Sequence, residues 1–170
     1  STTGFYHYTN ASYELDRKSP LGGMSCISYT MGQTPENFIY MVYDAKDKAV
    51  DATGFTHLEM DIYLEDASFV SDLYYAQLEL SSAGECDVEE VCFDLFKGFK
   101  KGWNHISFPI AHGRFNSATE KSFDISHVNY MRIQGVTNNP FTSIKIKLDN
   151  IYFTRGNGGD VPNQPIMMGE

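Results

Sequence analysis

His57-Leu58-Glu59-Met60-Asp61-Ile62-Tyr63-Leu64-Glu65 is the stretch that decides the fold of this 170-residue chain. Apolar and polar side chains alternate through it without a break. Because successive side chains of a β-strand point to opposite sides of the sheet, this period of two predicts a strand with one buried and one solvated face. Leu58, Met60, Ile62 and Leu64 are then expected to face the core.

Short stretches of similar character follow one another along the rest of the chain, separated by turn residues such as Gly32 and Pro35. In Tyr75–Ser81 the alternation is repeated, with Ala76, Leu78 and Leu80 expected inward. The other expected strands are 23–31, 37–44, 104–110, 128–136 and 143–153. About eight or more short antiparallel strands with polar connections predict an all-β sandwich or jelly roll.

The formal net charge of −9 narrows the class of partner. Nucleic-acid binding relies on basic residues that neutralise phosphates, and anionic lipid also attracts basic segments, so we expect neither partner. A neutral ligand, a cationic partner or calcium fits this charge. No stretch approaches the roughly 18 apolar residues of a membrane span. Any export signal was removed or belonged to a longer precursor.

The three cysteines, Cys26, Cys86 and Cys92, permit at most one disulfide. One alternative is a Cys86–Cys92 bridge across a loop. The other, which we favour, is free thiols that pack as small apolar side chains.

No sequence motif typical of an active site is present. The five histidines show no metal-ligand spacing, and no nucleophile-elbow, phosphate-cradling or dinucleotide-binding motif occurs. The acidic pairs Asp61/Glu65 and Glu89/Glu90 have the composition of an acid–base pair, but on alternating strands such residues usually form a solvated face. We therefore expect a binding protein rather than an enzyme.

Several short motifs occur in a recognisable order between residues 14 and 155. They are Gly22-Gly23-Met24-Ser25, Asp51-Ala52-Thr53-Gly54, Gly102-Trp103-Asn104, Phe123-Asp124-Ile125-Ser126-His127-Val128 and Leu148-Asp149-Asn150-Ile151-Tyr152-Phe153. In this order the chain resembles the galactose-binding-like β-sandwich carbohydrate-binding modules of bacterial polysaccharide-degrading enzymes. The resemblance implies an antiparallel sandwich over residues 1–155, followed by a linker or tail over 156–170.

The resemblance also bears on Asp87–Phe99. Its apolar spacing alone favours a helix, with Asp87 and Glu90 placed as in a capping box. Similar modules imply an extended edge strand near Val91–Leu95 and a tight turn before Gly102. We predict the strand.

Modules of this type commonly carry a structural calcium ion between the first and last strands. Calcium takes six to eight oxygen ligands, which carboxylates and carbonyls supply. The resemblance implies Asp149 as the ligand on the last strand, with Glu14 or Asp16 near the N-terminus. The alternative is that Asp149 accepts backbone N–H groups or pairs with Lys147 or Arg17.

Sugar recognition requires a flat aromatic ring and planar polar groups on one exposed face. The outward positions of the predicted strands supply this mixture. The expected ligand-binding residues are Tyr40, Tyr43, Tyr63, Gln77, Glu79, Tyr130, Arg132 and Gln134. The alternatives are a hydrated sheet face with a Glu79–Arg132 surface ion pair, and a site among the end loops that includes Tyr74, Trp103, Arg114, Phe115 and Asn138–Phe141.

The sequence thus predicts a non-catalytic carbohydrate-binding module, with β-glucan, xylan, mannan or a similar plant cell-wall polysaccharide as its partner. We expect it to be secreted or displayed on a bacterial cell surface and to be linked to neighbouring domains of a longer protein. A protein-interaction or adhesion domain is the rival interpretation, and a small polysaccharide hydrolase or lyase is a third.

Overall fold

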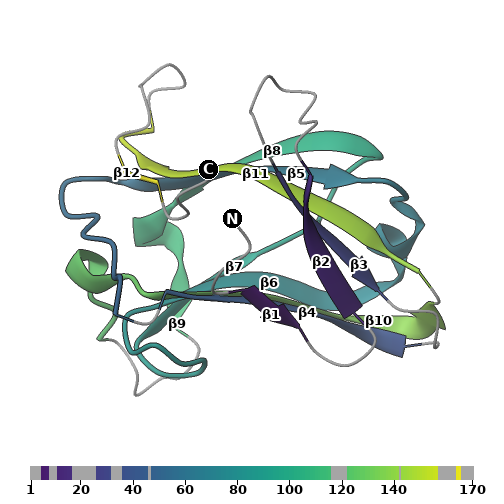
Figure 1. Cartoon of the computed structure of the whole chain (residues 1–170), viewed down its shortest axis with the longest axis horizontal. Coiled ribbons are helices and arrows are strands. Elements are labelled where there is room, and N and C mark those ends of the chain that lie inside the picture. The colour runs from purple at the N-terminus through teal and green to yellow at the C-terminus, as the bar shows by residue number, and fades with distance from the viewer. Residues whose placement is uncertain are drawn as a thin grey trace.

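Two antiparallel β-sheets face each other in the computed structural model (Figure 1). The structure describes residues 5–7, 11–16, 26–31, 36–45, 47–115, 122–141, 143–156 and 164–165. Every strand pair among these residues is antiparallel. The predicted fold class, an antiparallel β-sandwich, is confirmed.

The first sheet has the strand order β1-β4-β10-β6-β7-β9. Its strands are β1 (Phe5–His7), β4 (Glu36–Asp44), β10 (Tyr130–Phe141), β6 (Leu73–Ser81), β7 (Glu90–Asp94) and β9 (Arg114–Phe115). The second sheet has the order β2-β3-β11-β5-β8, and β12 also pairs with β11. Its strands are β2 (Ala11–Asp16), β3 (Cys26–Met31), β11 (Lys145–Thr154), β5 (His57–Leu64), β8 (Gly102–Pro109) and β12 (Gln164–Pro165).

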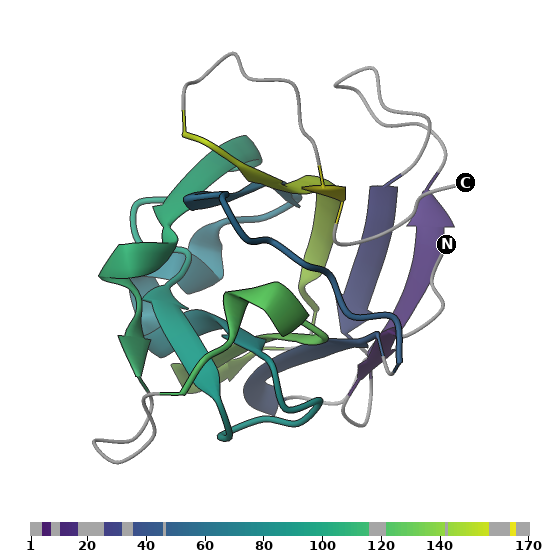
Figure 2. The same cartoon turned by 90° about the vertical axis from the view of Figure 1, so that its left-hand side faces the viewer.

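Short 3₁₀ helices occupy three of the connections, at the margins of the sandwich (Figure 2). They are η1 (Ser68–Asp72), η2 (Ile110–His112) and η3 (Ile125–His127). Among the described residues no helix has the length and apolar character needed to cross a membrane.

The core lies between the two sheets and follows the predicted alternation. Leu58, Met60, Ile62 and Leu64 of β5 are fully buried, and the intervening residues are only partly buried. From the facing sheet, the inward side chains of β6 and β10 complete the same cluster: Ala76, Leu78, Leu80, Met131 and Ile133. Each large aliphatic side chain buried in this way contributes about 1.5–3 kcal/mol.

The ambiguous segment after Asp87 forms strand β7, as predicted. Its helical spacing fails because the backbone takes a left-handed conformation on both sides of the strand, with φ of 65° at Asp87, 45° at Glu89 and 67° at Phe96. A right-handed helix requires negative φ throughout. Phe96 is instead a core side chain whose ring packs edge-on against Phe69, at 5.4 Å between ring centroids.

Cys86 and Cys92 are both free thiols in this structure, and Cys92 is buried. This outcome agrees with the alternative favoured above. The side chain of Cys26 lies outside the described residues.

Candidate functional site

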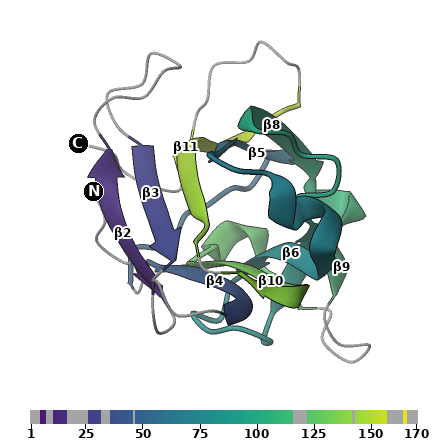
Figure 3. The ribbon, with the colours of Figure 1, turned by 90° about the vertical axis from the view of Figure 1, so that its right-hand side faces the viewer.

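Three adjacent strands of the first sheet, β4, β10 and β6, bring most of the predicted polar residues together (Figure 3). In the strand register Gln134 lies opposite both Tyr40 and Gln77, and Arg132 lies opposite Glu79. Since Met131, Ile133 and Leu78 belong to the core, these alternating neighbours point away from it. We call the outward set Tyr40, Gln77, Glu79, Arg132 and Gln134 the amide face.

The carboxylate of Glu79 is the centre of the amide face, although it is 0% exposed. Its Oε1 accepts hydrogen bonds from Nε2 of Gln77 and from Nε2 of Gln134, the latter at 2.7 Å. Its Oε2 accepts a hydrogen bond from Nε of Arg132. A buried carboxylate is costly unless it is paired and hydrogen-bonded, and these three donors meet that requirement.

Arg132 is 5% exposed and lies beneath the same surface. Besides Glu79 it contacts Oδ1 of Asp87 at 3.0 Å, and its guanidinium carbon lies 5.9 Å from the centre of the Tyr40 ring. Burial alone lowers the pKa of Arg132, but its hydrogen bond and charge interaction with Glu79 outweigh burial and raise the pKa. The guanidinium therefore stays charged.

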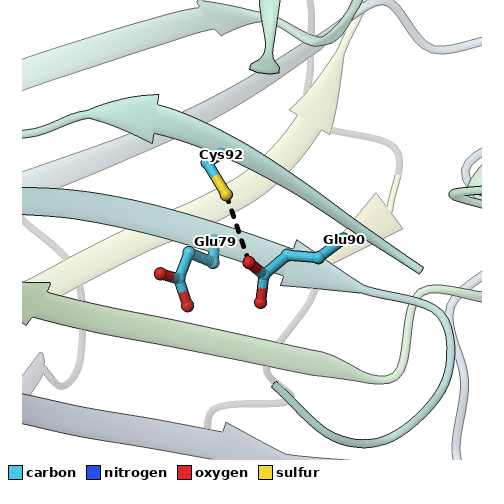
Figure 4. A group of neighbouring side chains, drawn as sticks. All are labelled: Glu79, Glu90 and Cys92. Carbon is cyan, nitrogen blue, oxygen red and sulfur yellow. Dashed lines mark hydrogen bonds between the residues drawn. The ribbon is translucent and has the colours of Figure 1, made fainter. Parts of the chain in front are cut away.

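A second buried carboxylate, Glu90, lies beside Glu79 (Figure 4). Its Oε2 accepts the backbone N–H of Asp87 at 3.0 Å, and its Oε1 accepts the thiol of Cys92 at 3.2 Å. Burial raises the pKa of Glu90, and the negative charge of Glu79 adds to this shift. Burial also raises the pKa of Cys92, which keeps its proton on sulfur.

Glu79, Glu90 and Cys92 each offer a ligand atom within 4.8 Å of the others, which is a spacing that can hold a metal ion. The protein itself already supplies the compensating charge. Arg132 contacts Glu79 directly and lies 3.8 Å from Oε2 of Glu90. We therefore interpret the trio as part of a structural network, in which the guanidinium of Arg132 supplies the positive charge that a metal ion would otherwise bring.

The structure corrects the predicted site at three tyrosines. Tyr43 lies opposite Met131 and packs against the core, because it is an odd number of residues from Tyr40. Tyr63 belongs to β5 in the second sheet, so it lies on the other side of the sandwich. Tyr130 points outward but is only 4% exposed.

Glu79 and Arg132 require a correction too, since both were expected on an open surface. They do lie side by side on the predicted face, but they are buried beneath it. The surface-ion-pair alternative is wrong for the same reason. Gln77, Gln134 and Tyr40 remain partly exposed and are the members of the amide face that a ligand can reach.

Aromatic rings flank this reachable part. Tyr75, two residues before Gln77 and therefore on the same face, is 39% exposed. Phe38 stacks on Tyr40, with ring centroids 5.8 Å apart and planes 21° from parallel. From the sequence, Tyr75 is an exposed candidate for stacking, whereas Phe38 was not predicted, although alternation along β4 is the signal that identifies it.

The residues of the end-loop alternative do not all lie together. Tyr74 is 75% exposed at the start of β6, whereas Phe115 pairs with Val91 at the other half of the sheet. Asn139 is held by Asp72 through two hydrogen bonds of 2.9 Å. Trp103 packs on Tyr63 at the edge strand β8, with 5.4 Å between ring centroids.

The outer face of the second sheet carries a separate polar cluster around His105. Its ring nitrogens lie 2.7 Å from Asp61 and 3.1 Å from Glu59. Partial burial lowers the pKa of His105, but the two carboxylates outweigh it and raise the pKa. Asp149, the predicted metal ligand, is buried on β11 directly opposite Asp61.

No family model matches the sequence, and no curated protein matches it. The fold is nevertheless similar to solved carbohydrate-binding modules. A family 11 module from Clostridium thermocellum in complex with a β-1,3-1,4-mixed-linked tetrasaccharide has a TM-score of 0.55 and 16% identity, over 87% of this chain and 85% of that chain. The family 30 module of the cellulosomal cellulase Cel9D-Cel44B of the same organism has a TM-score of 0.54 and 12% identity, over 87% and 84% of the two chains.

A larger enzyme contains a similar unit. The β-1,2-glucanase from Parabacteroides distasonis has a TM-score of 0.57 and 12% identity, over 88% of this chain and 22% of that chain. At these identities the comparisons establish the fold. The expected resemblance to the β-sandwich carbohydrate-binding modules is confirmed at that level.

Proposed function

We propose that this chain is a non-catalytic carbohydrate-binding module that binds a polysaccharide chain across the amide face. The observation that carries the proposal is the row Tyr40, Gln134 and Gln77, in which one ring and two planar amides lie on adjacent strands. Neighbouring strands are about 5 Å apart, which is close to the length of one sugar ring in an extended β-linked chain. Successive sugars can therefore meet successive strands.

The chemistry of the row suits neutral sugars. An aromatic ring covers the apolar C–H side of a pyranose, and planar amides hydrogen-bond its hydroxyl groups in fixed directions. The similarity in fold to carbohydrate-binding modules supports this proposal. A β-glucan, xylan or mannan is the expected class of ligand, and we include in the proposal secretion or surface display by a bacterium and linkage to an enzyme or scaffold.

The hydrolase alternative finds no support on this face. Glycosidases use two carboxylates that reach the scissile bond. Glu79 and Glu90 are both 0% exposed, and their oxygens are directed to Arg132, Cys92 and backbone or amide N–H groups. They are placed to support the surface rather than to contact a substrate.

A matched pair of tyrosines tests the proposed function. Tyr75 shares the amide face, whereas Tyr63 lies on β5 in the second sheet. We expect electrophoresis in gels that contain β-glucan, xylan, mannan or pectin to show retardation by at least one polymer. Tyr75→Ala should weaken that binding about tenfold, since an aromatic contact is worth about 1 kcal/mol or more. Tyr63→Ala is the control and should bind as the wild type does.

Retardation by none of the polymers would contradict the proposal and favour the protein-interaction alternative. A fall in polymer viscosity during incubation would instead identify an enzyme.

We also propose a structural calcium ion held by Asp149 with Glu14 or Asp16. The chemistry of the described part of the site fits a hard cation. Asp149 lies directly opposite Asp61, and the repulsion of two carboxylates in that relation is relieved by His105 beside Asp61 when it is protonated and would be relieved further by a cation. The backbone places Asp16 opposite Cys26 on β3, the strand between β2 and β11. The side chains of Glu14 and Asp16 lie outside the described residues.

Calcium binding predicts a shift in thermal stability. At a calcium concentration about a hundred times the dissociation constant, the melting temperature should rise by about 5 to 10 °C relative to protein in excess chelator. Asp149→Asn should remove most of this dependence. Equal melting temperatures of the wild type with calcium and with chelator, measured by calorimetry, would exclude the ion.

A further inference from the structure

Both amides of the amide face are bound to the same carboxylate. Gln77 and Gln134 lie directly opposite each other on β6 and β10, and each donates from Nε2 to Oε1 of Glu79. Glu79 in turn is paired with Arg132. The arrangement uses a fully buried group to hold two partly exposed ones.

The ionisation of Glu79 fixes the direction in which both amides point. An ionised carboxylate can only accept hydrogen bonds, so each glutamine must present its NH₂ group to it. Nitrogen and oxygen diverge from the same carbon of the planar amide, and an acceptor-only carboxylate repels the amide oxygen, so each amide oxygen is turned away from Glu79. No described residue donates a hydrogen bond to either of these oxygens.

We infer that Glu79 is a positioning residue, which turns the amide oxygens of Gln77 and Gln134 outward as a paired acceptor for ligand hydroxyl groups. This inference rests on the proposed function, because it specifies how the amide face selects its ligand. Arg132 contributes indirectly, since its Nε donates to Oε2 of Glu79 and so holds that carboxylate in place as an acceptor. Neither Glu79 nor Arg132 touches the ligand.

A paired acceptor makes a definite demand on the ligand. Glutamines directly opposite each other on antiparallel strands have Cβ atoms about 5 Å apart. A ligand that presents two neighbouring hydroxyl donors satisfies both oxygens. An analogue in which fluorine replaces one of those hydroxyls cannot donate there, so it leaves an amide oxygen desolvated and without a partner.

The orientation of the amides can be measured without any ligand. In wild-type protein, nitrogen-15 NMR should show one Nε2 proton of Gln77 and one of Gln134 protected from exchange with water. In Glu79→Gln the central group has only one acceptor oxygen and gains its own donor, so at least one of the two glutamines should lose that protection. Glu65→Gln, an exposed change at the end of β5, is the control and should leave both protected.

Ligand selectivity provides the second measurement. With the β-1,3-1,4-mixed-linked tetrasaccharide as probe, the deoxyfluoro series should bind the wild type about tenfold more weakly than the parent wherever the lost hydroxyl faced an amide oxygen. Glu79→Gln should bind the parent about tenfold more weakly and narrow the difference between parent and analogue, because a released amide can offer N–H instead. A purely structural role would lower both affinities equally.

The outcomes separate the two proposals. Unprotected glutamine Nε2 protons in the wild type would overturn the positioning role whatever the ligand result. Equal binding of parent and every analogue by the wild type would overturn it as well. Protected protons together with no binding of any glycan would support the orientation and contradict the proposed function.

Discussion

Replacing Arg132 with methionine is expected to lower the free energy of unfolding by about 3–5 kcal/mol at pH 7, as removal of one partner of a buried ion pair typically does. The guanidinium is the positive charge that lies against both Glu79 and Glu90, and both carboxylates are fully buried. Without it, two negative charges remain in a region that water does not reach. Urea denaturation monitored by fluorescence measures this loss.

Two further measurements identify its cause. The double variant Glu79→Gln, Arg132→Met should lose less stability than Arg132→Met alone, because it also removes one of the stranded charges. The penalty of Arg132→Met should also shrink as the pH falls and Glu90, whose pKa is raised by burial, takes up a proton. A loss under about 1 kcal/mol at pH 7 would show that the buried network does not depend on the guanidinium.

This expectation changes how a binding defect at Arg132 must be interpreted. From the sequence, Arg132 is a candidate to contact the sugar, and loss of binding in Arg132→Ala supports that role. In the structure Arg132 lies beneath Tyr40 and orders Asp87 and Glu79. Its removal disorders the surface from below, so the exposed Tyr75 gives the cleaner test of contact.

The elements and the facing of β5, β6 and β10 could be predicted because alternation is a local property of the chain. The sequence identified which residues share one side of a strand, and Ile62 of β5 and Leu78 and Leu80 of β6 are inward as predicted. Tyr63 shows the limit of that information. Its outward facing on β5 was predicted correctly, but whether β5 and β10 lie in the same sheet depends on long-range pairing that no local pattern encodes.

The burial of Glu79 and Arg132 could not be predicted from the sequence for a different reason. Both are outward-facing polar residues, and alternation assigns such residues to solvent. Contacts on the same side of the sheet take the place of solvent: Gln77 and Gln134 donate to Glu79, Tyr40 lies against Arg132, and Asp87 pairs with Arg132. A left-handed backbone at Asp87 makes this approach possible, and no composition rule predicts it.

The buried network under the amide face therefore carries one more negative charge than Arg132 can balance. Glu79 is matched by Arg132, and Asp87 is a second, partly solvated partner of the same guanidinium. Glu90 has a thiol, a backbone N–H and a more distant guanidinium instead of a close counterion. Burial without a close counterion, together with the charge of Glu79, raises the pKa of Glu90.

Replacing Glu90 with glutamine is expected to raise the free energy of unfolding by about 1–3 kcal/mol at pH 8, the cost of a poorly compensated buried charge. Glutamine keeps an oxygen for the backbone N–H of Asp87 and turns an N–H toward Cys92 and Glu79. The groups that face position 90 are thus Glu79, Arg132, Asp87 and Cys92, and each retains a partner.

The sign of the pH dependence follows from the raised pKa of Glu90. A carboxyl whose pKa is higher in the folded protein contributes full stability below its unfolded pKa and loses that contribution as the pH rises through the folded value. Glutamine never ionises. The gain in the free energy of unfolding from Glu90→Gln should therefore be absent in acid and appear as the pH rises through the folded pKa of Glu90. Glu85→Gln, an exposed change in the same connection, should alter stability by less than about 0.5 kcal/mol at every pH. A Glu90→Gln variant that is less stable than the wild type at pH 8 would mean that Arg132 requires both carboxylates, and that the ionised form of Glu90 is part of the fold rather than a cost to it.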